Sequence, residues 1–215
     1  MPEIADYGEI TLPIRVGLVG TGFVAKVRAQ NLDLESRTQL IAVAGRNPSR
    51  TAAFAGEFNT RAVADWQTLV GMPDLDLVIV STINGGRGEI VRAAIAAGKH
   101  TIVEYPISLD PQEAADIIAL AAAKKVLLHV EHIELLGGLH QTMRAWLGHL
   151  GELYYARYST IVPQRPTPQK WTFHRSEFGF PLVGALSRLH RFTDLFGSID
   201  SVNCHNQYWG GVGDY

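Results

Sequence analysis

The sequence predicts an α/β protein whose N-terminal part is a doubly wound parallel sheet. Two observations predict this fold class. Short apolar runs alternate with helical patterns up to Lys125. The runs are nearly continuous in apolar character, which suits strands that helices cover on both faces. Strands that alternate with helices in this way are joined by right-handed crossovers and therefore run parallel.

The predicted elements of this first part follow one another closely. Strands are expected at residues 14–19, 39–44, 75–82, 100–104 and 126–130. Helices are expected from Phe23 onward and at residues 48–57, 88–97 and 111–125. The strand at 126–130 is expected to join the same sheet.

The character of the sequence changes after this strand. A helix is expected at 135–150, weakened by two glycines, and another at 180–197, ending at Gly197. Residues 152–162 are aromatic and β-branched and predict a strand of a second sheet. A stiff loop is expected at 163–169, and residues 201–209 are expected to start another strand.

We therefore expect two domains, a Rossmann-type domain at 1–127 and an α+β sheet domain at 128–215. A second sheet of two strands with open edges is an unusual end point. We expect this second domain to be incomplete, as part of a longer protein.

Composition excludes several classes of function. The net charge is −2, and the sequence contains no cluster of five or more Lys and Arg residues, so no nucleic-acid partner is expected. No apolar stretch approaches the length of a membrane span, and the N-terminus does not read as a signal peptide. Cys204 is the single cysteine, which leaves no internal disulfide and fits a cytoplasmic protein.

A glycine-rich turn follows the first strand directly. The stretch "GLVGTGFVAK" gives Gly20-x-Gly22-x-x-Ala25 immediately before a helix. Gly20 permits the tight turn, Gly22 lets the backbone approach a pyrophosphate, and Ala25 allows close packing of helix and strand. In this context the pattern predicts a dinucleotide site, and the alternative is a structural turn that binds nothing. The predicted site also includes Thr21, Phe23 and Val24.

The exit of the second strand indicates which dinucleotide binds. An NAD enzyme usually carries an acid there for the ribose 2′-hydroxyl. This strand instead runs into "AGRNPSR", which holds no acid. Arg46 can grip a 2′-phosphate with its forked guanidinium, and Ser49 and Arg50 lie at a helix N-terminus that favours an anion. We expect NADP(H), and the alternative is a pair of solvated arginines.

Two further strand exits complete the predicted cofactor site. Thr82 and Asn84 follow the third strand and are expected near the nicotinamide ribose. Glu104, at the end of "HTIVE", is assigned both to cofactor binding and to catalysis. It is followed by Tyr105 and Pro106, which places a phenol where open α/β sheets bind their ligands.

The stretches "VGLVGTGF", "AAGKH" and "VEYP" resemble the family of two-domain oxidoreductases typified by glucose-fructose oxidoreductase and inositol dehydrogenase. Most of its members read E-K-P where this chain reads E-Y-P. The resemblance implies that a lysine, an aspartate and a histidine act on a sugar hydroxyl. In this chain those positions hold Tyr105, Ser187 and Arg191, so polyol oxidation is not expected.

The E-Y-P branch of that family is the biliverdin reductases, and the resemblance to cyanobacterial members extends over "AGKHTIVEYPISL", "LLHVEHIELLGGLHQ" and "RFTDLFG". It implies NADPH-dependent reduction of biliverdin to bilirubin, with a hydride added to the central methine carbon and a proton to a pyrrole nitrogen. This chain departs from the branch after "STIN", where "GGRG" stands in place of a histidine-containing turn. It also stops before the normal end of the family.

Tyr105 and Arg188 are the candidate catalytic residues beside Glu104. No general-base lysine is needed for this reduction, and a neutral phenol offers a flat, hydrogen-bonding surface to a tetrapyrrole. Alternatively, Tyr105 only shapes the pocket. Arg188 lies in the helix that resembles the pocket-lining helix of the family, and its permanent charge could polarise the bilin and relay a proton. Arg191 lies on roughly the same face and could bind a propionate. The alternative for either residue is an exposed arginine on the helix surface.

The stretch "HVEHIE" supplies the remaining substrate-binding candidates. On an extended strand His129 and Glu131 share one face, and His132 lies on the other. This alternation does not bring three ligands together, so no metal is expected. His174 and Arg175 follow Trp171 as further cations for the propionates, or cap a loop instead.

Two other functions stay open on sequence grounds. One is a different NADP-dependent oxidoreductase of the same family, acting on a sugar or an imine. The other is a non-catalytic module that binds NADP(H) or a bilin. Oligomeric state is not indicated by any pattern.

Overall fold

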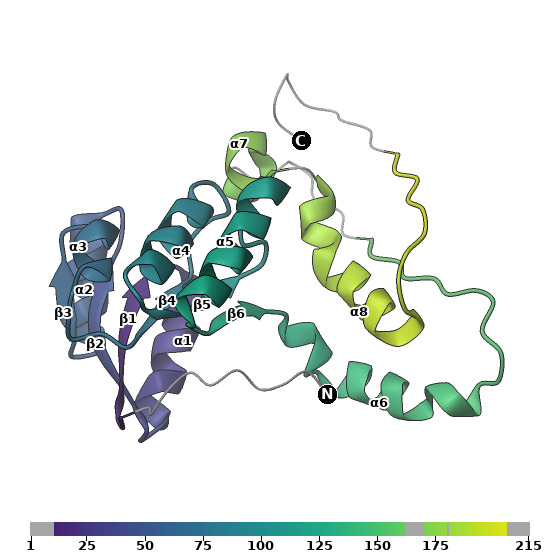
Figure 1. The fold of residues 1–215 in the computed structure, drawn as a ribbon, viewed down its shortest axis with the longest axis horizontal. Coiled ribbons are helices and arrows are strands. Elements are labelled where there is room, and N and C mark those ends of the chain that lie inside the picture. Colours follow the sequence, from purple (N-terminus) through teal and green to yellow (C-terminus); the bar gives the residue numbers. More distant parts are fainter. Residues whose placement is uncertain (1–10, 162–169, 180, 206–215) are drawn as a thin grey trace. The chain divides into compact units, whose positions relative to one another are not determined.

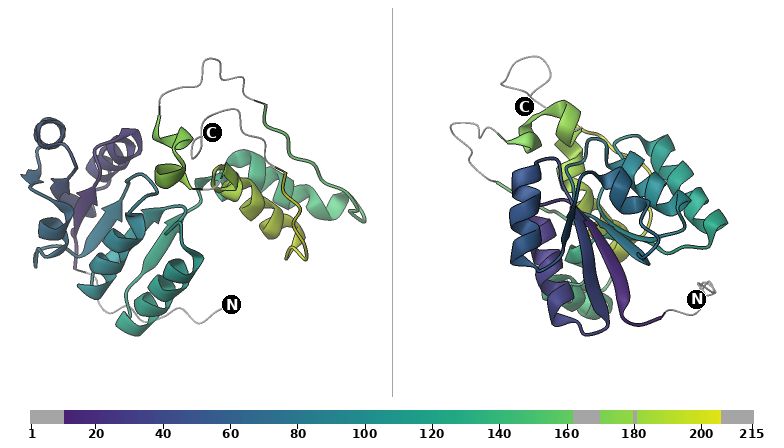
Figure 2. Two further views of the ribbon diagram at one scale, coloured as in Figure 1. Left: turned by 90° about the horizontal axis from the view of Figure 1, so that it is seen from above. Right: turned by 90° about the vertical axis from the view of Figure 1, so that its left-hand side faces the viewer.

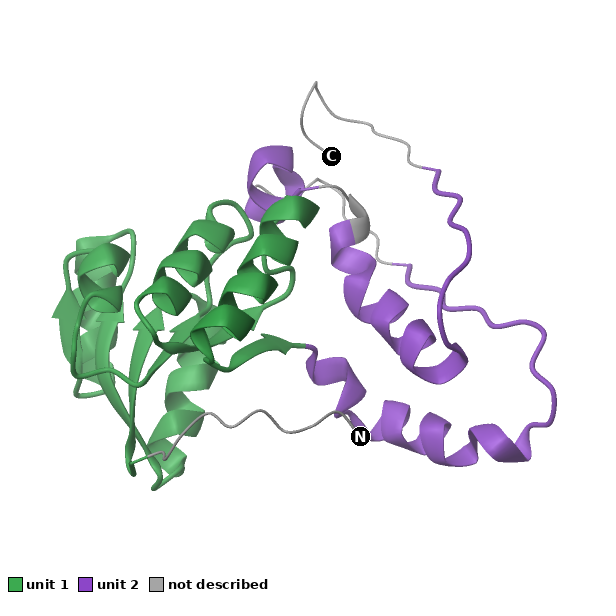
Figure 3. Cartoon of the chain, viewed as in Figure 1, with its two compact units in different colours: residues 1–131 green, residues 132–215 purple. Residues whose placement is uncertain are grey.

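The computed structural model describes residues 11–161, 170–179 and 181–205 (Figure 1). The chain divides into two compact units, Met1–Glu131 and His132–Tyr215 (Figure 3). The predicted domain boundary follows residue 127, whereas the first unit extends to Glu131. The difference is one strand, which pairs with the sheet of the first unit.

The first unit is built on one six-stranded sheet in which every neighbouring pair is parallel. The strand order is β3-β2-β1-β4-β5-β6. The strands are β1 Ile14–Val19, β2 Thr38–Ala44, β3 Arg61–Val63, β4 Leu77–Val80, β5 His100–Glu104 and β6 Leu128–Glu131. The predicted parallel sheet is confirmed. The prediction missed β3, whose three residues are too few and too exposed to form an apolar run.

Helices cover both faces of this sheet (Figure 2). They are α1 Phe23–Leu34, α2 Pro48–Glu57, α3 Trp66–Val70, α4 Arg87–Ala96 and α5 Pro111–Lys124. In β4, Leu77 and Ile79 pack into the core under α1 and α2, while Val78 and Val80 pack into the core under the other three helices. Burial on both faces explains why the strands read as continuous apolar runs.

Side-chain caps place the starts of two long helices. The Asn47 side chain accepts a hydrogen bond from the Arg50 N–H at 3.0 Å, and Asp110 accepts from the Gln112 N–H at 2.8 Å. Each cap is followed by a proline at the first helical position, where its fixed φ and missing N–H are tolerated. These caps start α2 and α5 close to the edge of the sheet where the strands end.

The second unit is helical in its described residues. Its elements are the 3₁₀ turns η1 Ile133–Leu135, η2 Leu147–His149, η3 Trp171–Phe173 and η4 Pro181–Ala185, and the helices α6 Gly138–Trp146, α7 Arg175–Phe178 and α8 Leu186–Phe196. The predicted helix at 135–150 begins only at Gly138. The predicted helix at 180–197 is a 3₁₀ turn followed by α8, which ends at Gly197 with φ +90°.

The predicted strands of this unit do not form in the described residues. Residues 152–161 carry no strand, and neither do residues 201–205; the rest of both predictions, like the loop at 163–169, lies outside the described ranges. Tyr154 and Ile161 are 96% and 91% exposed. Aromatic and β-branched residues favour strands only where a neighbouring strand supplies the ladder and the packing.

Among the described residues, no helix has the length and apolar character to cross a membrane.

Candidate functional site

Gly20 makes the tight turn after β1. Its φ is +126°, a conformation that residues with a side chain rarely adopt. A Cβ at this position would lie 2.3 Å from the carbonyl oxygen of Ser81, just beyond β4. The Gly20 N–H donates to the carbonyl oxygen of Ala44 at the end of β2, at 2.8 Å. Only glycine therefore fits where the exits of β1, β2 and β4 meet.

Gly22 is the N-cap of α1, and its surroundings are different. Its φ of −87° suits any residue, and a Cβ there would meet no described atom within 4 Å. No side chain caps α1, so its first-turn N–H groups have no side-chain acceptor. Phe23 and Val24 in that turn are 83% and 40% exposed. An uncapped helix N-terminus beside a glycine with open space fits a pyrophosphate.

Two arginines follow β2, and Arg50 makes a hydrogen bond to the described residues whereas Arg46 makes none. Arg50 donates from Nη2 to the carbonyl oxygen of Thr21 at 3.2 Å, which ties α2 to the glycine-rich turn. A Cβ at Gly45 would lie 2.9 Å from Cγ2 of Thr21, so the two loops pack closely. Arg46 and Ser49 are exposed and make no hydrogen bond or ion pair with the described residues. Arg46 is thus the side chain with an uncommitted guanidinium beside this turn.

Thr82 and Asn84 follow β4, and both take part in hydrogen bonds with nearby backbone groups. The Thr82 hydroxyl donates to the carbonyl oxygen of Ile83 at 3.1 Å. Asn84 is 4% exposed, and its carbonyl oxygen accepts from the N–H of Arg87 at 3.2 Å. The backbone of Asn84 therefore contacts the first residue of α4, two residues before Gly86, the N-cap of that helix.

No sequence pattern assigns a role to Arg87, which lies in the "GGRG" stretch where the chain departs from the family resemblance. Its side chain is buried, at 2% exposed. Nη1 donates to the carbonyl oxygens of Glu104 and Pro106, at 2.9 Å each, and Nη2 donates to that of Thr82. Burial lowers the pKa of Arg87 to about 10, and the nearby Glu104 and Tyr105 oppose this shift. The guanidinium stays charged at neutral pH.

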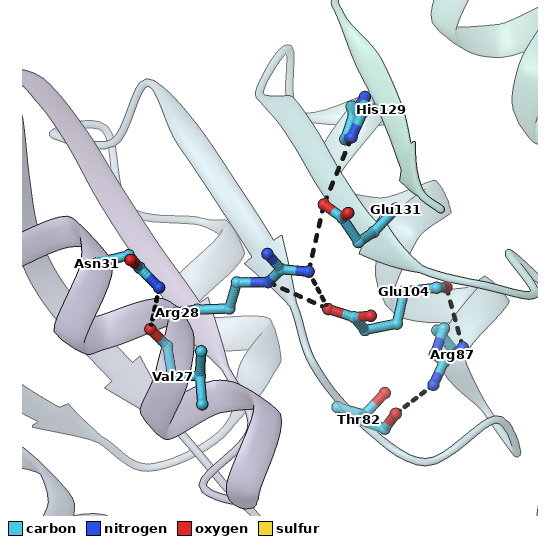
Figure 4. Close-up of polar contacts among 8 residues, drawn as sticks. All are labelled: Val27, Arg28, Asn31, Thr82, Arg87, Glu104, His129 and Glu131. Atoms are coloured by element: carbon cyan, nitrogen blue, oxygen red, sulfur yellow. Dashed lines mark hydrogen bonds and ion pairs between the residues drawn. The ribbon is translucent and has the colours of Figure 1, made fainter. Parts of the chain in front are cut away.

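A second missed arginine, Arg28 of α1, joins two carboxylates at the ends of β5 and β6 (Figure 4). Its Nη2 lies 2.8 Å from Oε1 of Glu104 and 3.2 Å from Oε2 of Glu131. His129 Nε2 lies 3.6 Å from the same Glu131 oxygen. The predicted shared face of His129 and Glu131 is confirmed, since both side chains contact each other. Nothing near Arg28 in sequence indicates this contact.

Tyr105 follows β5 directly and is half-buried. Its phenol is close enough to Arg87 for an electrostatic interaction. Tyr105 thus stands at the same strand edge as the Arg28 cluster, defined as Arg28, Glu104, His129 and Glu131.

In the second unit, Arg191 is largely buried and paired. Its Nε lies 3.5 Å from Oε2 of Glu134, and Nη2 donates to the Glu134 carbonyl oxygen at 3.4 Å. Its side chain is 13% exposed. The rings of His132 and His190 pack edge to face, with centroids 4.1 Å apart. Arg191 therefore links α8 to η1 in this structure.

Arg188 lies on the same helix and is less constrained. Its Nη1 donates to the carbonyl oxygen of Gly184 at 2.7 Å and to the Ser187 hydroxyl at 3.2 Å. Its guanidinium carbon lies 5.9 Å from the ring centroid of Tyr158. His174 is the N-cap of α7, and Arg175, the first residue of that helix, is exposed.

The sequence analysis did not predict a buried histidine in the second unit that binds a more exposed aspartate. His140 of α6 is 0% exposed, and its Nε2 donates to Oδ2 of Asp194 of α8 at 2.7 Å. This hydrogen bond holds the pKa of Asp194 below its usual range, helped by Arg144.

Across the described ranges, no group of three or more His, Cys, Asp or Glu side chains could hold a metal ion.

Comparison with solved structures gives a strong match to a protein that binds both a dinucleotide and a bilin. The crystal structure of biliverdin reductase from Synechocystis sp. PCC 6803, in complex with biliverdin and NADP+, is 51% identical to this chain, with a TM-score of 0.84. The match covers 88% of this chain and 60% of that one.

Curated relatives include enzymes of different specificity. A dTDP-3,4-didehydro-2,6-dideoxy-alpha-D-glucose 3-reductase from Saccharopolyspora spinosa is 31% identical over 170 residues, which are 78% of this chain and 51% of that protein. Biliverdin reductase A from Mus musculus is 26% identical over 188 residues, 87% of this chain and 60% of that protein. The chain thus spans between half and two thirds of the length of these relatives.

Residues 14–132 match the oxidoreductase family with an NAD-binding Rossmann fold, and this match contains β1 to β6, the glycine-rich turn and the Glu104-Tyr105-Pro106 segment. The chain therefore belongs to the Gfo/Idh/MocA oxidoreductase family.

Proposed function

We propose that this protein, as part or whole of its native chain, reduces biliverdin to bilirubin with NADPH. The overall change adds a hydride to the central methine carbon and a proton to a pyrrole nitrogen, with release of NADP+. The likeness to the Synechocystis enzyme, which binds biliverdin and NADP+, supports both the substrate and the cofactor. A cytoplasmic location belongs to the proposal, since Cys204 leaves no internal disulfide.

The residues at the exits of β1 and β2 fit an NADP(H) dinucleotide. The uncapped start of α1 offers N–H groups to the pyrophosphate, and Gly22 leaves room for it. Arg46 is exposed and has no partner among the described residues, so it is available for the 2′-phosphate. Arg50, which is tied to the Thr21 carbonyl oxygen, positions the turn. When bound, the reduced nicotinamide would supply the hydride.

The observation that carries the proposal is Tyr105 at the end of β5. A polyol oxidation needs a base at this position, because a hydroxyl proton must leave. Tyr105 places a phenol there, instead of the lysine that the family resemblance implies for polyol oxidation. It does offer an aromatic face and a hydrogen-bond donor, which suit a flat conjugated tetrapyrrole.

Arg188 is the candidate that delivers the proton to the pyrrole nitrogen. Its guanidinium is permanently charged, so it stabilises negative charge that develops on the bilin and orders a water that donates the proton. Arg191, engaged with Glu134, is the weaker candidate for a propionate. His174 and Arg175 are the further candidates for propionate binding, while His129, Glu131 and His132 are candidates to hold the geometry of the pocket or a water.

One mixing experiment tests the proposal. NADPH and biliverdin are added to the full chain, and the loss of the green bilin band and the rise of a yellow band are followed. Turnover supports the proposal. Binding of both ligands without turnover would instead identify a binding module, and turnover of keto sugars alone would identify a sugar reductase, the activity of the Saccharopolyspora relative.

A further inference from the structure

Arg87 is a buried cation at an unfavourable place in the fold. It is the first residue of α4, where the helix dipole repels positive charge. It is also 2% exposed, so its charge is largely removed from water. Since both effects oppose a cation here, its contacts must compensate for them.

The compensating contacts are three backbone carbonyl groups at the last residue of β5 or just past the ends of β4 and β5. The paired residues of β4 and β5 end at Val80 and Val103. Arg87 binds carbonyl oxygens beyond this pairing, that of Thr82 after β4 and those of Glu104 and Pro106 at the end of β5. The guanidinium continues the connection between the two strands where their own hydrogen bonds have stopped.

The residue enclosed by these contacts is Tyr105. Its two neighbours in sequence, Glu104 and Pro106, both accept from Nη1 of Arg87. The backbone on either side of the phenol is therefore fixed to one rigid group in α4. Glu104 is fixed a second time through its carboxylate, by Arg28.

We propose that Arg87 is a positioning residue, which fixes the Glu104-Tyr105-Pro106 segment and so sets where the Tyr105 ring meets the substrate. This inference rests on the proposed function for its catalytic consequence. Its structural part, the attachment of the segment to α4, stands independently of the substrate.

The decisive variant is Arg87→Lys in the full chain. Lysine keeps the charge but offers one point donor instead of a planar fork, so it cannot hold all three carbonyl groups. We expect kcat for biliverdin to fall on the order of 100-fold, as a displaced reacting group would cause. The NADPH dissociation constant should change far less than kcat, because the exits of β1 and β2, which are proposed to hold the pyrophosphate and the 2′-phosphate, are untouched. Unchanged kcat would overturn the inference.

The matched control is Arg92→Lys on the same helix. Arg92 is 41% exposed and lies 3.9 Å from Glu113, away from the three carbonyl groups. This variant should keep both kcat and NADPH affinity. An equal loss in both variants would show a general effect on α4 and would also overturn the inference.

Chemical rescue separates positioning from folding. In Arg87→Ala, added methylguanidinium should restore part of kcat, whereas methylammonium, which lacks the fork, should not. Equal recovery with both cations would contradict the proposed geometry. If Arg87→Ala does not fold, Arg87→Lys decides alone.

Hydrogen exchange tests the attachment without any substrate. The amides of Glu104, Tyr105, Ile107 and Ser108 should exchange about tenfold faster in Arg87→Lys than in the unmodified chain, while those of α5 stay unchanged. Unchanged exchange at 104–108 would overturn the inference. If the unmodified chain reduces no biliverdin but the exchange result is obtained, the proposed function fails and the attachment of the segment is still supported.

Discussion

Glu104 and Glu131 are register partners at the ends of neighbouring parallel strands, and one guanidinium, that of Arg28, binds both carboxylates. All three side chains are largely buried, at 22% exposed or less. Two carboxylates so placed would repel each other without the shared cation. Arg28 therefore connects α1, which carries the nucleotide turn, to the strand exits that carry Glu104 and Tyr105.

Replacing Arg28 with Met should destabilise the fold by about 2 kcal/mol, because it leaves two partly buried carboxylates without their charged partner. Denaturant unfolding measures this loss. Adding Glu131→Gln to Arg28→Met should recover part of it, since the repulsion is then removed. Strictly additive effects of the two substitutions would contradict the shared contact.

Gly20 and Gly22 should respond oppositely to alanine. Gly20→Ala places a Cβ 2.3 Å from the Ser81 carbonyl oxygen at a positive φ, so it should cost about 2 kcal/mol or more of folding stability. Gly22→Ala meets no described atom and should fold normally, yet weaken NADPH binding on the order of tenfold by blocking the pyrophosphate. Thermal unfolding and NADPH fluorescence titration give the two readouts. Normal NADPH affinity in Gly22→Ala would remove this turn from the cofactor site.

Arg46→Asp should impair NADPH use far more than NADH use, since it replaces a phosphate-binding fork with a repelling charge. We expect the dissociation constant for NADPH to rise on the order of 100-fold, measured by fluorescence. Lys124→Asp, which makes the same charge change at an exposed position in the last turn of α5, is the control. Equal losses with both dinucleotides would sink the assignment of NADP(H).

Arg188→Ala should lower kcat for biliverdin on the order of 100-fold while NADPH affinity is retained, because it removes a charge used at the pyrrole nitrogen. Single-turnover absorbance measurements give the rate of the chemical step. Arg157→Ala, which removes an exposed guanidinium bound only to Ser159 in the described residues, should leave that rate unchanged. An unaltered rate in Arg188→Ala excludes this residue from proton delivery.

The stability contributed by Asp194 should depend on pH. Because the hydrogen bond from His140 lowers the pKa of Asp194, its stabilising effect is present above the unfolded value of 3.8 and is lost as pH falls through the lower folded value. Asp194→Asn should thus reduce the melting temperature at pH 7 by about 2–4 °C. The difference should shrink as the pH falls below 3.8. Asp200→Asn, at an exposed position, is the control and should show no such pH dependence.

The long strands and the nucleotide turn were predictable because their signals are local. Strands buried on both faces are apolar throughout, and the turn after β1 needs glycine at φ +126° whatever lies far away in the chain. By contrast, β3 is three residues long and half-exposed, so it carries no such signal. The segment 152–161 has strand-forming residues but forms no ladder in the described part of the chain, because propensity does not supply a partner strand.

The class of fold, the position of the dinucleotide turn and the unusual phenol after β5 could be predicted from the residues alone, since each depends on neighbouring residues in the chain. The partners of the charged side chains became known only once the chain was folded. Arg28 lies 76 residues from Glu104, Arg191 lies 57 residues from Glu134, and His140 lies 54 residues from Asp194. A charge that is about to be buried can be compensated by any opposite charge or carbonyl group that the fold brings close, and no local pattern specifies which one.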